Sequence, residues 1–415
     1  MSIATSTELS HSNPYPFDPS MTRYIDIPAR DHLPAASLFA RISTPHNRAA
    51  KSVDPDFPTL LLCHPLWTDS FIFFPQFDEP AFAESWNIVC LEVRGHGETV
   101  VEQFTAAVPF TWWDAADDAY LALRELGVAS VHVLGASLAT ILALRLAQKY
   151  PSFVSSLSLI DPASGTESED WASAFDDCKQ LLTRAILGGD AEALDDVTVG
   201  SWAMGIRQIT SPIKHLRERF MDHQRTKLMD GRLLLAAPYL TGLLDGRSQT
   251  LPEEEAANIT CPVLILYSSE VGLAEREGYQ KLVETINAAG KSHHRPARAI
   301  AICIEDAPRW LALTLPHVVH PLVCEHLSMA TMPAVKSLPP SPISVTFSRS
   351  SRTSFSSLGS ARRTSSPREM AGFDIPPPPK AGPGVLTLGQ VLDQEHAEGI
   401  PVTVEVSVTV HEGRE

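Results

Sequence analysis

Residues 131–150 read VHVLGASLATILALRLAQKY, and this stretch decides the fold. It begins with a short valine-rich run that is typical of a buried strand, and a nearly continuous apolar helix follows. Between them, Gly135 and Ala139 place small residues on both sides of Ser137. A serine in a G-x-S-x-G/A turn of this kind projects its hydroxyl above the sheet, at the positive end of the next helix. The stretch therefore predicts a nucleophile elbow with Ser137 as the nucleophile.

On both sides of this turn, short apolar runs alternate with helical periods, which indicates an α/β fold with a mostly parallel central sheet flanked by helices. An antiparallel hairpin is expected to open the sheet, over residues 24–27 and 37–42. Strands that are apolar on both faces are expected at residues 59–63, 87–93, 131–134, 154–160, 262–267 and 298–304. One insertion has no strand pattern but four amphipathic helical stretches, near residues 171–187, 191–204, 213–228 and 233–244. It predicts a helical cap over the sheet.

The pattern divides the chain into five segments. We expect a flexible N-terminus, a first part of the core, the helical cap, a second part of the core and a low-complexity tail, over residues 1–20, 21–162, 163–255, 256–332 and 333–415. The tail is rich in Ser, Pro and Arg and cannot bury enough apolar surface to fold, so it is predicted to be disordered. Alternating valines near its end allow a terminal strand, whose pairing the sequence leaves open.

Composition excludes several classes of function. The formal net charge of −16 argues against general binding to nucleic acid or anionic membranes, and no apolar run is long enough to cross a bilayer. The N-terminus lacks the basic and apolar regions of a secretory signal, and the six cysteines are scattered without metal-binding spacing. Motifs for nucleotide, flavin or zinc binding are also missing. We therefore expect a cytoplasmic protein with no metal or other cofactor.

Further motifs follow the ends of the predicted strands. They are His64-Pro65, Arg94-Gly95-His96-Gly97 and Leu159-Ile160-Asp161-Pro162. With these motifs, the chain resembles the α/β-hydrolase superfamily from about residue 58 to residue 327. The resemblance implies activity on small ester, lactone or related acyl substrates. It also implies an oxyanion hole made of the backbone N–H of Leu138 and that of Leu66 or Trp67. Proline replaces the family's usual glycine at position 65 and removes one donor from that loop. The same resemblance gives His64 and His96 a role in organising loops.

The family's catalytic order is serine, acid, histidine, and the acid position departs from it. Val271 stands where the aspartate is expected after the strand at residues 262–267. Glu270, one residue earlier, is one replacement. Asp161 is the other, because some family members carry their acid after the strand that follows the elbow. The alternative role of Asp161 is to form an Asp-Pro turn.

The position of the catalytic base departs further from the family pattern, because Arg309 stands where the family has its histidine. Arginine stays protonated at neutral pH and cannot accept the serine proton, although it could bind a carboxylate or an oxyanion. His317 and His320 are the nearest histidines, but they reach Ser137 only if the loop is remodelled. We expect them to be solvated or to contact the cap. His293-His294 precede the last strand of the core, at the end of the sheet opposite the elbow.

The sequence is compatible with three functions. The first is a serine hydrolase of small acyl substrates, which the elbow around Ser137 favours. The second is a catalytically weak or silent family member that binds a small ligand or a partner, which Val271 and Arg309 favour. The third is a lyase or cyclase on the same fold, which needs a polar pocket more than a complete triad.

Overall fold

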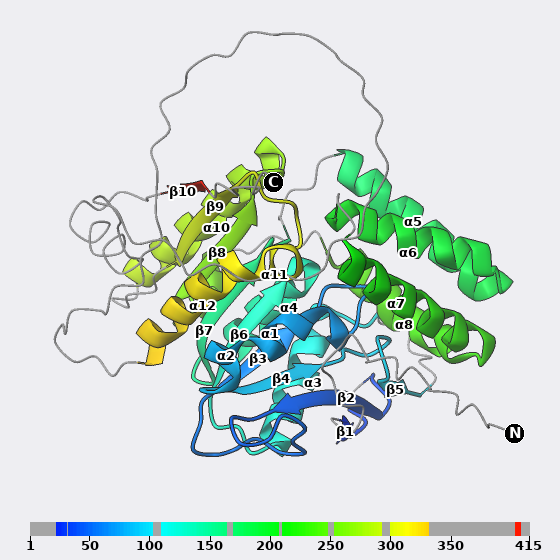
Figure 1. Cartoon of the computed structure of the whole chain (residues 1–415), viewed down its shortest axis with the longest axis horizontal. Helices are drawn as coiled ribbons and strands as arrows, with labels where there is room; N and C mark the ends of the chain where they lie inside the picture. Colours follow the sequence, from blue (N-terminus) through cyan, green and yellow to red (C-terminus); the bar gives the residue numbers. More distant parts are fainter. Residues whose placement is uncertain are drawn as a thin grey trace, which may run out of the picture.

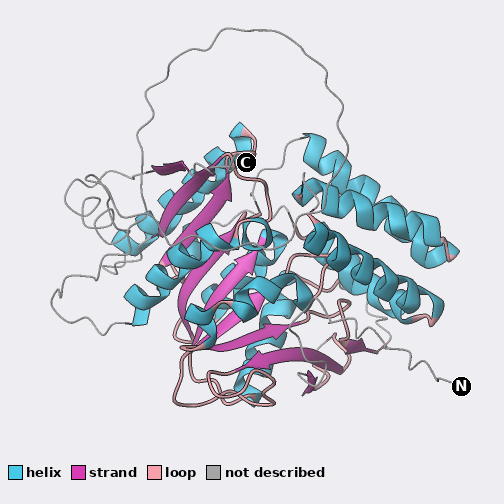
Figure 2. Cartoon of the chain, viewed as in Figure 1, coloured by secondary structure: helices cyan, strands magenta, loops and turns pink. Residues whose placement is uncertain are grey.

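The computed structural model describes residues 22–30, 32–102, 109–163, 169–206, 210–247, 253–292, 299–331 and 403–407. Within these residues, one twisted sheet runs through the molecule, with helices on both of its faces and a layer of four helices beside it (Figures 1 and 2). The expected flexible segment 1–20, almost all of the expected tail, and His293 and His294 lie outside the described residues. In the part of the chain that the structure describes, no helix is both long and apolar enough to cross a membrane.

The sheet has the strand order β1-β2-β4-β3-β6-β7-β8-β9-β10, with β5 paired to β2. β1 and β2 form an antiparallel hairpin, β2 also pairs antiparallel with β4, and the strands from β4 through β3 to β9 are parallel. The strands are β1 (Thr22–Ile27), β2 (Ala36–Ser43), β3 (Thr59–Cys63), β4 (Asn87–Leu91), β5 (Val100–Val101), β6 (Val131–Ala136), β7 (Val154–Ile160), β8 (Val263–Ser268), β9 (Ala299–Glu305) and β10 (Thr403–Ser407). The predicted α/β fold is confirmed. The terminal strand β10 pairs in parallel with β9, Thr403 lying opposite Ala301.

Helices cover both faces of the sheet because its central strands are apolar on both sides. On one face pack α3 (Trp112–Glu125), α4 (Thr140–Lys149) and α10 (Leu273–Ser292). On the other pack α1 (Phe74–Asp78), α2 (Pro80–Ala83) and α12 (Pro316–Thr331). The remaining short helices are η1 (Ser70–Phe73), η2 (Ser137–Ala139), α9 (Glu253–Ala256) and α11 (Leu311–Thr314).

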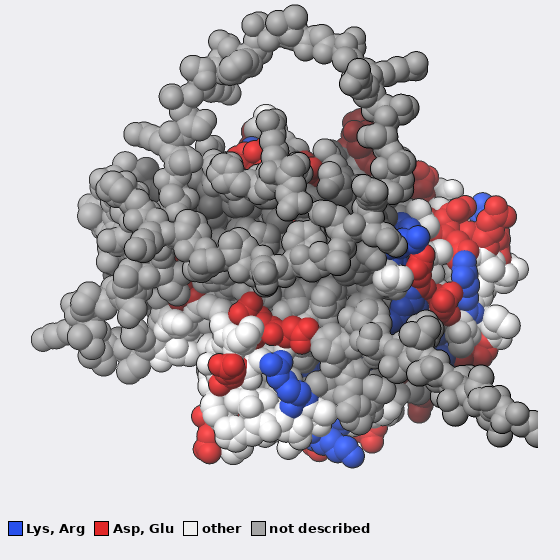
Figure 3. Space-filling model, viewed as in Figure 1, with Lys and Arg blue, Asp and Glu red and all other residues white. Residues whose placement is uncertain are grey.

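Four helices, which we call the cap helices, lie beyond one end of the sheet (green in Figure 1). They are α5 (Glu169–Gly188), α6 (Ala191–Gly205), α7 (Ser211–Met229) and α8 (Arg232–Asp245). α5 and α7 each pack against both α6 and α8. Acidic and basic side chains are interspersed on the visible surface of this layer (Figure 3), and some of them pair, as Arg225 does with Asp195.

The cap helices are fixed to the core by buried polar contacts. The Lys227 ammonium on α7 donates to the carbonyl oxygens of Gly95 and Gly97, at 3.3 and 3.2 Å. On α8, the Leu243 carbonyl accepts a hydrogen bond of 2.9 Å from the Trp112 indole of α3. These contacts hold the cap helices over the carboxyl ends of the parallel strands, where the predicted site residues lie.

Candidate active site

Ser137 lies on a sharp turn between β6 and η2, which leads into α4. Its φ of 54° is left-handed, a conformation that costs free energy for a residue other than glycine. Gly135 has little room for a side chain, because a Cβ there would lie 3.1 Å from the Thr140 Cα. The Thr140 hydroxyl donates to the Ser137 carbonyl oxygen at 2.6 Å and accepts from the Ala163 amide at 3.0 Å. The turn therefore has the geometry of an elbow.

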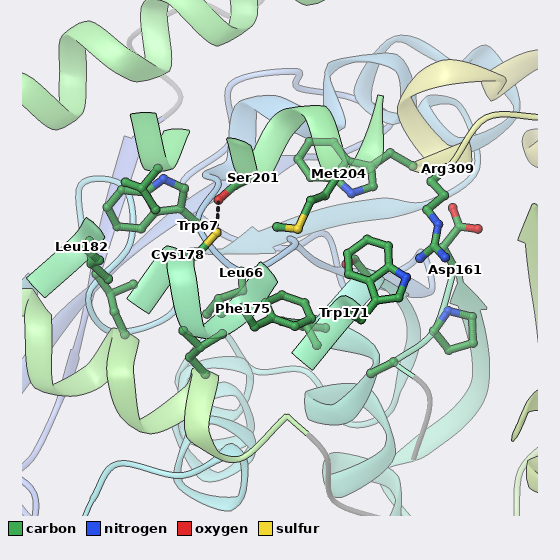
Figure 4. Close-up of a pocket in the computed structure, with 18 of the residues that line it drawn as sticks. Leu66, Trp67, Asp161, Trp171, Phe175, Cys178, Leu182, Ser201, Met204 and Arg309 are labelled. Atoms are coloured by element: carbon green, nitrogen blue, oxygen red, sulfur yellow. Dashed lines mark hydrogen bonds between the residues drawn. The ribbon is translucent and has the colours of Figure 1, made fainter. Parts of the chain in front are cut away.

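Ser137 is half-buried and lines a cavity of about 120 Å³ between the sheet and the cap helices. Most of its wall is apolar, and Figure 4 shows Trp171, Phe175 and Met204 pointing into it. The charged residues of the wall are Asp161, Glu275 and Arg309. The full lining is Leu66, Trp67, Ser137, Leu138, Asp161, Pro162, Ala163, Trp171, Phe175, Cys178, Leu182, Val197, Ser201, Met204, Leu240, Leu244, Glu275, Arg309 and Trp310. The arrangement suits a small apolar ligand with one polar end.

Of the two predicted acid candidates, Asp161 is the one that lines this cavity. Ala136 of β6 lies opposite Ile160 of β7, so Ser137 and Asp161 are the next residues on two adjacent strands. The carboxylate accepts hydrogen bonds from the amides of Ser268 and Leu311, at 3.1 and 2.9 Å. Burial raises the pKa of Asp161 to about 6, although these amides and the Arg309 charge act in the opposite direction. Asp161 therefore does more than form a turn, because it joins the end of β8 to the loop after β9.

Arg309 lies in that loop and lines the same cavity as Ser137. Its guanidinium forms an ion pair of 2.6 Å with Glu275, in the first turn of α10. The guanidinium carbon is 4.3 Å from the ring centroid of Trp171, on α5 (Figure 4). Glu275 also accepts from the Gly272 amide at 2.9 Å. Arg309 is thus held by one core helix and one cap helix.

The other acid candidate, Glu270, does not line the cavity. It lies in the loop after β8, where its amide donates to the Ser268 hydroxyl at 3.0 Å, and the neighbouring Val271 is buried. Sequence reasoning missed Glu275. The available signal was the arginine at the position where the family has a histidine, because a partly buried guanidinium needs an acidic partner nearby.

The residues predicted to form an oxyanion hole also border the cavity. Leu66 and Leu138 both line it. The amide of Trp67, the alternative to Leu66, is already engaged, because it donates to His96 Nε2 at 3.1 Å. His96 is buried, which lowers its pKa well below the usual value and leaves the ring neutral. Leu66 is therefore the remaining candidate from this loop.

No histidine in the described part of the chain lines the cavity. His64 is buried and accepts from the Val93 amide at 3.2 Å, which fits the expected role in loop organisation. His320 is buried and its Nδ1 lies 2.7 Å from the Glu79 carboxylate, whereas His317 is exposed. The cavity thus brings together Ser137, the acids Asp161 and Glu275, and Arg309. The same described residues include no group of three His, Cys, Asp or Glu placed to hold a metal ion.

Comparisons with known proteins agree with this architecture. A sequence model of the alpha/beta hydrolase fold matches residues 58–230. Ethanol acetyltransferase 1 of Eremothecium cymbalariae is 25% identical over 202 residues, which cover 48% of this chain and 51% of that protein. The match thus spans about half the length of this relative.

Solved structures are similar over a larger share of the chain. A thermophilic esterase from Thermogutta terrifontis has a TM-score of 0.54 at 17% identity, covering 75% of this chain and 100% of the esterase. A carboxylesterase from Bacillus subtilis has a TM-score of 0.51 at 16% identity, covering 75% and 93%. At these identities the structures show a common fold. Together with the sequence match, they show that the chain has the α/β-hydrolase fold.

Proposed function

We propose that the protein is a slow serine-type acyl hydrolase of small, neutral, largely apolar esters, with Ser137 as its nucleophile. The observation that carries the proposal is the left-handed backbone of Ser137 beside the cavity between the sheet and the cap helices. Such strain costs roughly 1–3 kcal/mol and persists where the surrounding structure enforces it, most often at functional sites. The tight packing around Gly135 and the two hydrogen bonds of Thr140 enforce it here.

The surroundings of Ser137 support acyl chemistry. Leu138 is the second residue of η2, which leads into α4, so its amide lies at the positive end of a helix, and Leu66 lines the same cavity. Two such donors stabilise the oxyanion that forms when a serine attacks an ester. The similar proteins named above are an acetyltransferase and two esterases, which fits a substrate of the ester class.

The wall of the cavity favours a neutral substrate. Its apolar side chains include Trp171, Phe175 and Met204, which suit a short acyl or alkyl chain. The one cation of the wall, Arg309, is already paired with Glu275, and Asp161 adds a second carboxylate. An anionic ester would therefore meet more negative than positive charge.

Turnover is expected to be slow because no histidine among the described residues lines the cavity. A general base typically contributes about 10²–10⁴-fold to the rate. Arg309 cannot replace it, since the guanidinium remains protonated and is fixed by Glu275 and Trp171. The same contacts favour a second candidate function, a catalytically silent protein that binds a small ligand in the cavity.

Hydrolysis of p-nitrophenyl acetate and p-nitrophenyl butyrate separates the two candidates. We expect slow release of p-nitrophenol by the wild type and none above background by Ser137→Ala. Ser328→Ala, which removes an exposed hydroxyl on α12, serves as the matched control and should behave as the wild type. If the wild type and Ser137→Ala release the product at equal rates, the hydrolase proposal is wrong and ligand binding without catalysis becomes the better account.

A further inference from the structure

We propose that Asp161 replaces the missing histidine as the general base for Ser137, and that it acts through one bridging water. This inference rests on the proposed function, since it assigns the proton acceptor of the same reaction. In the usual arrangement an aspartate orients a histidine, whereas here the carboxylate would take the proton itself.

The topology brings the two side chains to the same place. Ala136 and Ile160 are opposite each other in the parallel pair β6 and β7, and neighbouring strands lie about 4.8 Å apart. Ser137 and Asp161 are the next residues, and both have a left-handed φ, of 54° and 46°. Both line the main cavity and also a second, smaller cavity. The serine and the carboxylate therefore leave the sheet side by side.

The smaller cavity has the size of one water molecule. Its volume is about 10 Å³, and most of its wall is apolar. Ser137 and Asp161 are the two polar partners that it offers a water, and the remaining lining includes Pro65, Phe73 and Trp310. A space of roughly 10–15 Å³ with polar partners can hold a water. The Asp161 carboxylate is turned toward Ser268 and Leu311, which belong to elements beyond β7 on the side away from β6. A water is therefore the natural link back to Ser137.

The carboxylate keeps the capacity to accept this proton. An ionised carboxylate has about four acceptor sites; the amides of Ser268 and Leu311 occupy two, and the Trp310 amide interacts with a third, which leaves about one for a water. The charged or titratable groups facing Asp161 are Arg309 from the loop after β9, and Glu275 and Tyr279 from α10. Arg309 and Glu275 form a pair, and burial raises the pKa of Tyr279 well above its usual value, so that the phenol stays neutral.

The buried environment of Asp161 also suits it to act as a general base. Burial raises its pKa to about 6, which makes it a stronger base than an ordinary carboxylate while it remains ionised above neutral pH. As the Ser137 oxygen attacks the ester carbonyl carbon, its proton passes to the water, and a proton of the water passes to Asp161. The leaving alcohol takes that proton back, which leaves the acyl-enzyme. A second water then attacks the acyl carbon and gives its proton to Asp161 by the same path. The Ser137 oxygen leaves with a proton, so one ester and one water yield one acid and one alcohol.

The test is the rate at which a fluorophosphonate labels Ser137 between pH 4.5 and 8.5, measured by intact-protein mass spectrometry. We expect the wild-type rate to rise about tenfold per pH unit up to an inflection near pH 6 and then to level off. Asp161→Asn should lose the inflection and label about 10²-fold more slowly at pH 8, the lower end of a typical general-base contribution. Asp306→Asn, an exposed acid of the loop after β9 that also has a left-handed φ, is the matched control and should follow the wild type.

The outcomes distinguish this inference from the proposed function. If the wild type is not labelled at any pH, both are wrong. If it is labelled at a rate that does not change between pH 5 and pH 8, or if folded Asp161→Asn is labelled as fast as the wild type, only the role of Asp161 is overturned. The wild-type profile decides the question alone if Asp161→Asn fails to fold, which circular dichroism would show.

Discussion

Substituting histidine for Arg309 tests how the cavity limits the rate. The change places an imidazole on the loop after β9, in the cavity that also contains Ser137 and Asp161. An imidazole can accept the serine proton and Asp161 can orient it, so Arg309→His should hydrolyse p-nitrophenyl butyrate faster than the wild type. General-base catalysis contributes about 10²–10⁴-fold, and we expect an increase near 10²-fold because nothing else in the loop has been adjusted for the new ring.

The same substitution should destabilise the protein. It removes an ion pair of 2.6 Å whose side chains, Arg309 and Glu275, are only 16% and 11% exposed. It also removes the stacking of the guanidinium on Trp171. Losing one partner of a fully buried pair costs about 3–5 kcal/mol, and this pair keeps some contact with water, so we expect about 2 kcal/mol. For a domain of this size that corresponds to a melting temperature lower by about 5 °C.

Arg309→Gln is the control for both effects, because it removes the charge without adding a base. It should lose about the same stability as Arg309→His and gain no activity. Equal activity gains in the two variants would refute the reasoning, since the cation and not the missing base would then limit the rate. If the wild type already hydrolyses esters rapidly and Arg309→His changes nothing, another histidine is the base, and His317 is the first to substitute.

Two further predictions concern stability. Gly242→Ala should destabilise the protein by about 3 kcal/mol in thermal melting, because the added Cβ would lie 2.3 Å from the Phe110 carbonyl oxygen. Gly200→Ala is the control within a helix; its added Cβ would meet nothing within 4 Å, so it should not destabilise the protein. The buried Asp161 holds its proton more tightly in the folded state, with a pKa of about 6 instead of 3.8, so the free energy of unfolding should fall as pH rises from about 4 to 6. Urea titrations should show a loss of about 3 kcal/mol for the wild type and none for Asp161→Asn. If the difference in unfolding free energy between the two proteins stays constant over this pH range, the raised pKa of Asp161 is contradicted.

Much of the fold was predictable because it depends on patterns that are local in the sequence. The apolar runs of the parallel strands are short and continuous, and all the predicted strands occur within two residues of their expected bounds. The turn at Ser137 was predictable for the same reason, since the close approach of Thr140 admits only a small residue at Gly135.

Parts of the site were not predictable, because they depend on which elements meet in space. Glu275 lies 34 positions before its partner Arg309, on a helix whose approach to the loop after β9 no local pattern specifies. The engagement of the Trp67 amide by His96 likewise joins two loops that end different strands. The pairing of β10 with β9 crosses about 100 positions of sequence and could not be assigned from alternation alone.

The central claim is that Ser137 is a nucleophile that works without a histidine base. The most direct measurement is tryptic mapping of the protein after incubation with a fluorophosphonate at pH 8, with samples taken from seconds to hours. We expect one adduct, on the peptide that contains Ser137. It should accumulate over minutes to hours and should not form in Ser137→Ala. An adduct on another residue, or no adduct after hours, would contradict it.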